Sequence, residues 1–216
     1  SLRDRLRGNP RRMKPRDYQA LAIAETAKHS ADSPILVSPT GSGKTFMGTR
    51  IVRQLAEQTG ERVLLLAHRR ELISQARGAF ETAGVPTGAI MAGERYTDAP
   101  VQVGSIETFR RRLSSCDWVQ RILPEFGALV LDECHHAAAK TQENLTKLLR
   151  IPVLGLTATP FRLDGKGLGR VFNRLIVAAY PDQLIEQGYL INPLVFAHPS
   201  SDNVTDGIRM RGKDYD

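Results

Sequence analysis

The sequence contains few cysteines and no long apolar run, and each shortage excludes a class of protein. Its 216 residues include two cysteines, Cys116 and Cys134, which are far apart and form no C-x-x-C pair. This argues against a disulfide framework and fits a reducing compartment. No apolar segment is long enough to cross a bilayer, and no apolar core follows the basic start, as a secretory signal requires. We therefore expect no membrane association and a location in the cytoplasm, the nucleoid or the nucleus, with a mitochondrial location left open.

Positive charge is concentrated at the start of the chain. The formal net charge is +7, and residues 1–16 carry six arginines and one lysine against Asp4, which gives 7 − 1 = +6. A hydrophobic fraction of 41% and a charged fraction of 25% are otherwise typical of one globular domain. The basic N-terminal arm at residues 1–13 is therefore a solvated tail, a polyanion-binding segment, a transit-like leader or the remnant of a larger upstream region.

Short apolar runs alternate with helical patterns along the chain. Apolar residues recur at helical spacing after Asp17, around residues 72–80 and among the leucines of residues 145–149. Continuous apolar runs are expected of parallel strands that are buried on both faces. We therefore predict an α/β fold, a doubly wound, mostly parallel sheet with helices on both faces, whose ligands gather beyond the carboxyl ends of the strands. The predicted strands are Ile35–Val37, Val63–Ala67, Val101–Val103, Ala128–Leu131 and Val153–Leu156.

A phosphate-binding loop follows the first predicted strand. The residues SPTGSGKT, from Ser38 to Thr45, match G-x-x-x-x-G-K-[ST] except that Ser38 replaces the first glycine. Glycines let the backbone N–H groups turn toward phosphate oxygens, and a following helix adds a favourable dipole. The lysine binds the β- and γ-phosphates, and the threonine hydroxyl binds Mg²⁺. The alternative is a glycine-rich turn with an incidental lysine. The predicted nucleotide-binding residues of the loop are Thr40, Gly41, Ser42, Gly43, Lys44 and Thr45.

Two adjacent carboxylates close the strand predicted at Ala128–Leu131. Asp132 is predicted to hold Mg²⁺ together with Thr45, and Glu133 to orient and deprotonate the attacking water. With Lys44, Glu133 is thus predicted to be catalytic. The alternative for this stretch, which also contains Cys134 and two histidines, is a zinc site. Consecutive residues at a strand end point in different directions, which argues against it.

The motifs, taken together and in order, resemble those of superfamily 2 helicases. The resemblance runs from about Lys14 to about Phe196 and corresponds to the first of that family's two RecA-like domains. The DECH box with TATPFRLDGKG at residues 157–167 is most similar to DNA-repair and phage recombination helicases and to the translocase motors of some restriction enzymes. The matching motifs are RDYQ at 16–19, SPTGSGKT at 38–45, AHRREL at 67–72, VGSIETF at 103–109, DECH at 132–135 and TATP at 157–160.

The resemblance implies roles for residues beyond the phosphate loop. Gln19 matches the glutamine that reads the adenine edge, which implies ATP as the nucleotide; the alternative is a glutamine at a helix start that faces water. His135, Thr157 and Thr159 match the residues that couple the phosphate state to the nucleic-acid face, with strand-end polar residues that satisfy the local backbone as the alternative. The domain would span residues 14–196. Residues 197–216 would be a linker toward a second RecA-like domain that is absent from this chain.

The same resemblance implies contacts with a nucleic-acid backbone. Arg69 and Arg70 follow one strand, and Ser105 and Thr108 follow another, where family members touch sugar and phosphate. Arg162, after TATP, is a further candidate, with an ion pair to Asp164 as an equal alternative. Arg110, Arg111 and Arg112 would fan out on a helix, so some of them face solvent.

The sequence therefore predicts the N-terminal ATP-binding domain of a helicase or translocase that uses ATP and Mg²⁺ and acts on nucleic acid, with DNA favoured over RNA. Two alternatives stay open. One is a nucleotide-dependent clamp or sensor with vestigial hydrolysis, and the other is an RNA helicase, because contacts to phosphate do not distinguish the two nucleic acids.

Overall fold

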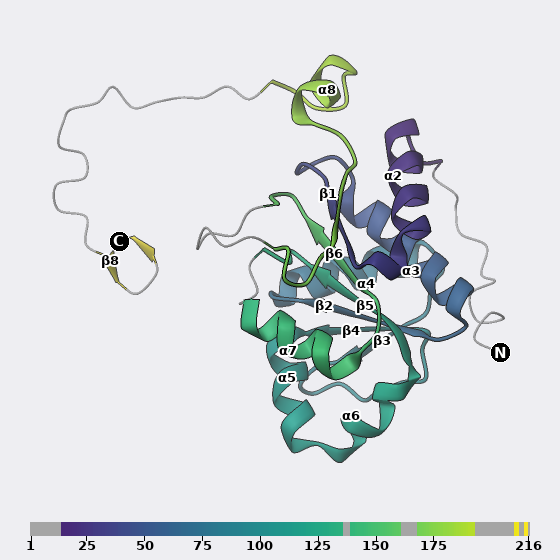
Figure 1. Ribbon diagram of the computed structural model, residues 1–216, viewed down its shortest axis with the longest axis vertical. Helices are drawn as coiled ribbons and strands as arrows, with labels where there is room; N and C mark the ends of the chain where they lie inside the picture. Colours follow the sequence, from purple (N-terminus) through teal and green to yellow (C-terminus); the bar gives the residue numbers. More distant parts are fainter. Residues whose placement is uncertain (1–13, 136–138, 161–167, 193–209, 212–213, 216) are drawn as a thin grey trace.

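The protein is a three-layer α/β structure built on one parallel sheet (Figure 1). The computed structural model describes residues 14–135, 139–160, 168–192, 210–211 and 214–215. Seven strands pair in the order β3-β4-β2-β5-β6-β1-β7, and every pair in this sheet is parallel. The predicted doubly wound sheet is confirmed.

All five strands predicted from apolar runs are present within two residues of their expected ends. Two further strands, β3 and β7, form the edges of the sheet, and the apolar-run criterion missed them. The sequence of β3 is TGAI, and β7 has two exposed residues among its four, because an edge strand is covered less completely than a central one. The strands are β1 (Pro34–Val37), β2 (Arg62–Ala67), β3 (Thr87–Ile90), β4 (Val101–Ser105), β5 (Phe126–Asp132), β6 (Val153–Thr157) and β7 (Arg174–Val177).

Helices cover both faces of the sheet. The first of them begins at Asp17, as predicted. The helix predicted around the leucines of residues 145–149 is present over residues 139–149, where Leu145 is buried and Leu148 is 51% exposed. The helices are α2 (Asp17–Lys28), α3 (Lys44–Thr59), α4 (Arg70–Thr82), α5 (Ile106–Ser115), α6 (Asp117–Ile122), α7 (Ala139–Leu149) and α8 (Pro181–Glu186), with 3-10 turns η1 (Ser30–Asp32) and η2 (Leu123–Glu125).

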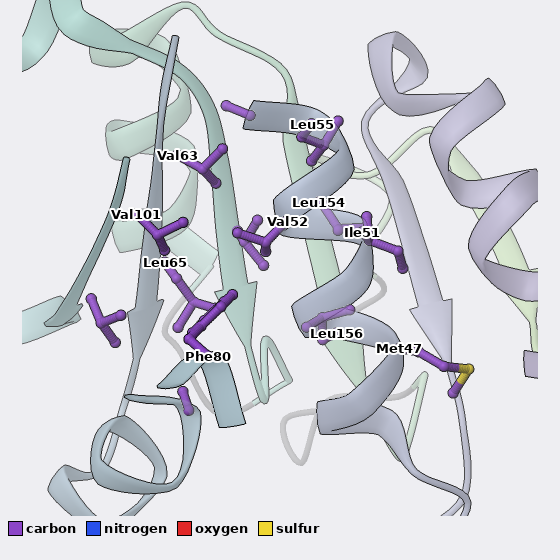
Figure 2. Close-up of a cluster of buried hydrophobic side chains, with 14 of the residues drawn as sticks. Met47, Ile51, Val52, Leu55, Val63, Leu65, Phe80, Val101, Leu154 and Leu156 are labelled. Carbon is purple, nitrogen blue, oxygen red and sulfur yellow. The ribbon is translucent and has the colours of Figure 1, made fainter. Parts of the chain in front are cut away.

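Two hydrophobic clusters fix these helices to the sheet. On one face, Met47 and Ile51 of α3 and Phe80 of α4 pack against residues of β2, β4 and β6 (Figure 2). On the other face, Phe109 of α5 and Leu145 of α7 belong to a second cluster with side chains of β1, β2, β3, β5 and β6. Because both faces are buried, the strands read as continuous apolar runs.

The topology brings the carboxyl ends of β1, β6 and β5 side by side. Val37 is paired with Thr157, and Asp132 with Leu156, so the loop after β1 and the carboxylates after β5 flank the end of β6. Sequence motifs far apart in the chain therefore meet at one edge of the sheet, as expected for ligand sites of this architecture.

The predicted terminal segments lie mostly outside the described residues. This is the case for the basic arm at residues 1–13. Within the predicted linker at residues 197–216, the structure describes a short antiparallel pair, β8 (Met210–Arg211) and β9 (Asp214–Tyr215). Among the described residues, none of the helices combines the length and the apolar character that spanning a membrane requires.

Candidate functional site

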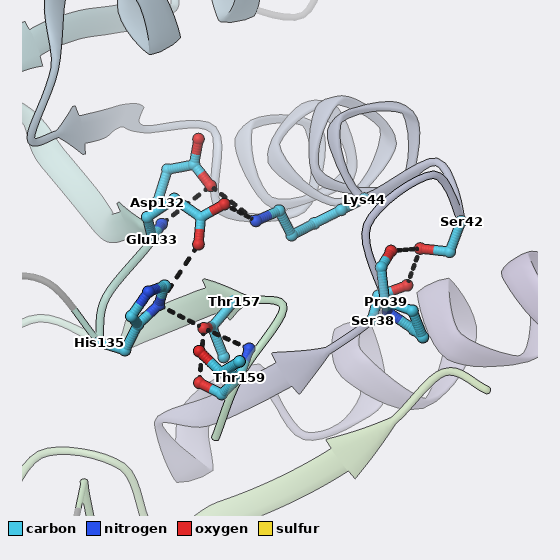
Figure 3. A network of polar contacts seen from close by, with 9 residues as sticks. All are labelled: Ser38, Pro39, Ser42, Lys44, Asp132, Glu133, His135, Thr157 and Thr159. Atoms are coloured by element: carbon cyan, nitrogen blue, oxygen red, sulfur yellow. Dashed lines mark hydrogen bonds and ion pairs between the residues drawn. The ribbon is translucent and has the colours of Figure 1, made fainter. Parts of the chain in front are cut away.

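The turn from β1 into α3 is held together by its own hydroxyl groups. The side chains of Ser38 and Ser42 hydrogen bond to each other inside the loop, and the Ser42 hydroxyl also lies 2.5 Å from the carbonyl oxygen of Pro39 (Figure 3). Both serines are buried, and the Ser38 N–H donates to the Thr157 carbonyl of β6 at 3.0 Å. The serine that replaces the first glycine of the motif therefore braces the loop from within and does not fill the space above it.

The glycine before α3 lies against Gln19. Gly43 has a φ of 86°, a left-handed conformation that favours glycine, and a Cβ atom there would lie 2.6 Å from Gln19 Nε2. Gln19 is buried; its Nε2 donates to the Ser42 carbonyl at 2.8 Å, and its Oε1 accepts the N–H of Arg16 at 3.0 Å. The alternative in which Gln19 faces water is wrong, because its amide joins α2 to the phosphate loop.

Lys44, at the start of α3, is shared between the two carboxylates after β5 (Figure 3). Its Nζ atom forms an ion pair with Glu133 Oε1 and lies 4.0 Å from Asp132 Oδ1. The three side chains are 14%, 19% and 17% exposed. Glu133 has a φ of 46°, an unusual value for a residue with a side chain, and its N–H donates to Asp132 Oδ1 at 3.0 Å. Such backbone strain is typical of functional sites and here turns the glutamate toward the lysine.

The charges of this cluster do not balance. Two carboxylates share one ammonium, and burial, opposed by Lys44, raises the pKa of Asp132, with the Glu133 charge acting in the same direction as burial. Glu133 Oε2 is one of two buried side-chain atoms in the described part of the chain that form no hydrogen bond. Carboxylate and hydroxyl oxygens are the ligands that Mg²⁺ prefers. The donor set of Asp132 and the exposed Thr45, with its uncompensated negative charge, therefore fits a magnesium ion.

A chain of polar contacts leads from Glu133 to the end of β6. His135 Nδ1 lies 3.3 Å from Glu133 Oε2 and 2.7 Å from the hydroxyl oxygen of Thr157. That hydroxyl donates to the Thr159 carbonyl at 2.7 Å and accepts the Thr159 N–H at 3.1 Å. The structure thus brings together the three residues predicted to couple phosphate state to nucleic acid, although their coupling role stays a prediction.

The residue between Glu133 and His135 points into the core. Cys134 is fully buried, and burial raises the pKa of its thiol to about 12. Gln142 of α7 donates its side-chain N–H to the Cys134 carbonyl and so fixes the turn. In the described residues, no three His, Cys, Asp or Glu side chains gather in a way that could hold a metal ion; His136 lies outside them.

The residues predicted to contact nucleic acid follow the carboxyl ends of two neighbouring strands, β2 and β4. Arg69 and Arg70 are exposed at the start of α4, and Ala67 of β2 is paired with Ser105 of β4. Ser105 also caps α5, since its hydroxyl accepts the Thr108 N–H at 3.4 Å. Arg162 lies outside the described residues. The structure therefore gathers four of the five candidates at this edge, and their contacts stay predictions.

The arginine triple of α5 divides as its helical spacing predicts. Arg110 is exposed and pairs with Glu107 at 3.1 Å, and Arg111 is exposed as well. Arg112 is half-buried, donates to the Met91 carbonyl at 2.6 Å and lies 5.7 Å from the Trp118 ring. Arg112 thus has a structural task.

Several residues at the site were not predicted. Tyr18 donates its hydroxyl to the Ser42 carbonyl at 2.6 Å, and a hollow of about 250 Å³ beside it is lined by Arg16, Gln19, Phe46 and the loop glycines. Tyr18 and Arg16 belong to the RDYQ motif, so the sequence contained a signal by which they could have been found. Gln142 carried no such signal, because its contact depends on how α7 packs.

The comparison with known proteins places this geometry in a family. Residues 12–162 match the model described as the type III restriction enzyme, res subunit. A 51.5 kDa protein of a Lactococcus phage is 30% identical over 182 residues, covering 84% of this chain and 36% of that protein. A putative DNA 3'-5' helicase Rad25 of Halobacterium salinarum is 30% identical over 175 residues, covering 76% of this chain and 27% of that protein. The chain thus spans about a third, or less, of these relatives.

Among solved structures, the UvsW helicase from bacteriophage T4 is similar in fold, with a TM-score of 0.62 and 21% identity over 79% of this chain and 62% of that chain. The resemblance predicted from the motifs is confirmed at the level of a helicase RecA-like domain. Because the family model matches most of the chain, including the loop of Lys44 and both carboxylates, this chain belongs to the family of the type III restriction enzyme res subunit.

Proposed function

We propose that this chain is the ATP-binding domain of a superfamily 2 DNA helicase or translocase of the DECH subtype, which hydrolyses ATP to ADP and phosphate. The observation that carries the proposal is the sharing of Lys44 by Asp132 and Glu133 beside the phosphate loop. Lys44 lies at the start of α3, a position from which its ammonium group can reach phosphate oxygens bound by the loop.

Nucleotide binding begins with the loop. The backbone N–H groups around Gly41 and Gly43 and the start of α3 bind phosphate oxygens, and Gln19 reads the adenine edge while its amide stays joined to Ser42. Lys44 binds the β- and γ-phosphates. Glu133 lies beside Lys44, at a place from which it can orient the attacking water.

Hydrolysis then depends on the two carboxylates. Asp132 and Thr45 would hold Mg²⁺, which would neutralise part of the negative charge on the phosphates. Glu133 orients the attacking water and accepts its proton. The presence of Glu133 at this position favours hydrolysis over a clamp or sensor that only binds nucleotide.

The change at Glu133 reaches the nucleic-acid edge through His135 and Thr157. His135 Nδ1 contacts both Glu133 and the Thr157 hydroxyl, and that hydroxyl contacts Thr159, so a displacement of Glu133 on nucleotide binding would be transmitted along these contacts. Arg69, Arg70, Ser105 and Thr108 bind the sugar-phosphate backbone from the neighbouring strand ends. The name of the Halobacterium relative, a putative DNA helicase, supports DNA over RNA as the partner.

A second RecA-like domain completes the active site. An arginine from another domain is typically worth about 10³ to 10⁵ in kcat for this class of reaction, which is about 4 to 7 kcal/mol of barrier. The chain alone therefore binds ATP but hydrolyses it slowly, with little stimulation by DNA. Fast, DNA-stimulated hydrolysis by the chain alone would contradict this part of the proposal.

Calorimetric titration with ATP and Mg²⁺ tests the assigned roles. Lys44→Ala should lose affinity because a phosphate-binding cation is gone, whereas Glu133→Gln should bind nearly as the unaltered chain does. Equal losses in the two variants would overturn the division between binding and base catalysis.

DNA binding is tested by its dependence on salt. Each neutralised phosphate of duplex DNA adds about −0.9 to the slope of log K against log salt. If the strand ends carry the contacts, Arg69→Ala and Arg70→Ala flatten the slope. If the slope changes only when residues 1–10 are removed, the basic arm carries them instead.

A further inference from the structure

The segment that follows α8 lies against the phosphate loop, although it is far away in sequence. Its backbone is well anchored, since the N–H groups of Tyr189 and Leu190 both donate to the carbonyl of the buried Leu184, at 2.7 and 3.0 Å. Leu190 Cδ2 lies 3.0 Å from the place that a Cβ atom on Gly41 would take. Leu190 therefore packs on the loop at Gly41.

The Tyr189 side chain contacts two residues of the RDYQ motif. The guanidinium carbon of Arg16 lies 4.2 Å from the centroid of the Tyr189 ring, within the range of a cation–π interaction. The ring of Tyr18 is 5.8 Å away, centroid to centroid, and the Tyr18 hydroxyl donates to the Ser42 carbonyl. Tyr189 thus connects to the loop through Tyr18 and to the adjoining hollow through Arg16.

The hollow beside this cluster suits a purine base. Its lining combines the guanidinium of Arg16, the amide of Gln19 and the ring of Phe46. A planar guanidinium stacks on aromatic faces, and an amide offers a donor and an acceptor together. The ring of Tyr189 holds the otherwise flexible Arg16 side chain in place, so an entering base meets an ordered cation, and less conformational entropy is lost on binding.

We propose that Tyr189 is a positioning residue for the base of a purine nucleotide and that, through it, the segment after α8 is coupled to nucleotide binding. This inference rests on the proposed function, because it concerns the same nucleotide site. The coupling is reciprocal: docking of the segment strengthens base binding, and a bound base strengthens docking of the segment.

The test compares a ligand that has a base with one that has none. ADP and inorganic tripolyphosphate, each with Mg²⁺, are titrated by calorimetry into the unaltered chain and into Tyr189→Ala. The variant should bind ADP about 2- to 5-fold more weakly, the range expected when a cation–π contact between two exposed side chains is lost. Its affinity for tripolyphosphate should equal that of the unaltered chain, because the phosphate loop is intact.

Two variants separate positioning from general damage to the fold. Tyr189→Phe keeps the ring face and should restore ADP affinity. Tyr180→Ala removes another exposed tyrosine, just ahead of α8, and should leave both affinities unchanged. Unaltered ADP affinity in Tyr189→Ala, a parallel loss of tripolyphosphate binding, or failure of Tyr189→Phe to restore ADP binding would each overturn the proposal. If the unaltered chain binds neither ADP nor tripolyphosphate, the proposed function itself is wrong. This result is distinguishable from the three outcomes that overturn only the role of Tyr189.

Hydrogen exchange gives a second measurement on the unaltered chain. Saturating ADP should slow amide exchange at Tyr189 and Leu190, because a base bound to Arg16 stabilises the contact between Arg16 and the Tyr189 ring. Tripolyphosphate should protect the loop around Gly41 and have a smaller effect on this segment. Equal protection of the segment by both ligands would mean that it responds to the phosphates alone, which contradicts the role assigned to Tyr189.

Discussion

Two charged clusters lie at opposite ends of the strands, one at the carboxyl ends and one at the amino end. They have the same charges and different surroundings. At the carboxyl ends of the strands, Lys44 is shared by Asp132 and Glu133. At the amino end of β2, Arg62 pairs with Asp98 and with Glu125, the latter at 2.6 Å, and also hydrogen bonds to the hydroxyl of Tyr96. Each cluster has one cation and two carboxylates.

The exposure of the carboxylates separates the two clusters. Asp98 and Glu125 are 61% and 44% exposed, so water screens their surplus charge, and Arg62 acts as a clamp between loop and strand. Asp132 and Glu133 are less than one fifth exposed, and burial, with the Glu133 charge acting in the same direction, raises the pKa of Asp132. The same charges thus make a structural contact where water reaches them and a candidate ligand site where it does not.

The largest expected effect is on hydrolysis. Glu133→Gln keeps the shape of the side chain but cannot accept a proton, so turnover by any longer form of the protein that hydrolyses ATP should fall by about 10² to 10⁴. Steady-state phosphate release measures it, and Glu125→Gln at the opposite edge is the control. Comparable losses in both variants would erase the distinction between the clusters.

Next in size is the loss of nucleotide affinity in Lys44→Ala. A charge-assisted hydrogen bond is worth about 1.5–3 kcal/mol, so the affinity for ATP should fall by about 10- to 150-fold. The matched variant at the other edge, Arg62→Ala, should bind ATP as the unaltered chain does. Calorimetry on the two variants decides this, and a loss in Arg62→Ala would show that the clamp also shapes the site.

Arg62→Ala should instead lower stability. Its side chain is largely buried, and the variant leaves Tyr96 and the two carboxylates without their shared donor. The expected cost is about 1–2 kcal/mol, which corresponds to a Tm lower by about 2–8 °C for a chain of this size. Thermal unfolding followed by circular dichroism measures it. An unchanged Tm would mean that the exposed pairs contribute nothing.

The smallest expected effect is a gain in stability, in contrast to the losses predicted above. Burial raises the pKa of Asp132 in the folded protein, so the folded state loses stability as the pH rises through that pKa, and the loss persists at neutral pH. Asp132→Asn removes the buried charge and should raise the Tm of the nucleotide-free chain at pH 7, while Asp98→Asn should not. A lower Tm in Asp132→Asn would contradict the account of the unbalanced cluster.

The sequence predicted the central part of the molecule better than its edges. Central strands such as β5 are buried on both faces and appear as apolar runs, whereas β3 and β7 do not, because edge strands tolerate small and polar residues. Within the site, Lys44 and Glu133 were predictable because phosphate chemistry requires those residue types at fixed spacings.

Contacts made through space were not predictable in the same way. Gln19 was recognised by its motif, yet its burial against Gly43 depends on how α2 packs on the loop. Tyr189 and Leu190 lie in no motif, and they reach the site only because α8 ends beside α2. The periodicity of apolar residues and the spacing of motifs carry no information on tertiary contacts between segments that are far apart in the sequence.

The most direct test of the central claim is the Tm shift produced by Mg²⁺ and ADP in three forms of the chain. A ligand at 100 times its Kd adds about 2.7 kcal/mol, which corresponds to about 5–11 °C for a chain of this size. The account predicts this shift in the unaltered chain, the same shift from a lower starting point in Arg62→Ala, and a loss of its Mg²⁺-dependent part in Asp132→Asn. A full Mg²⁺-dependent shift in Asp132→Asn, or its loss in Arg62→Ala, would contradict the assignment of the ligand site to the buried cluster.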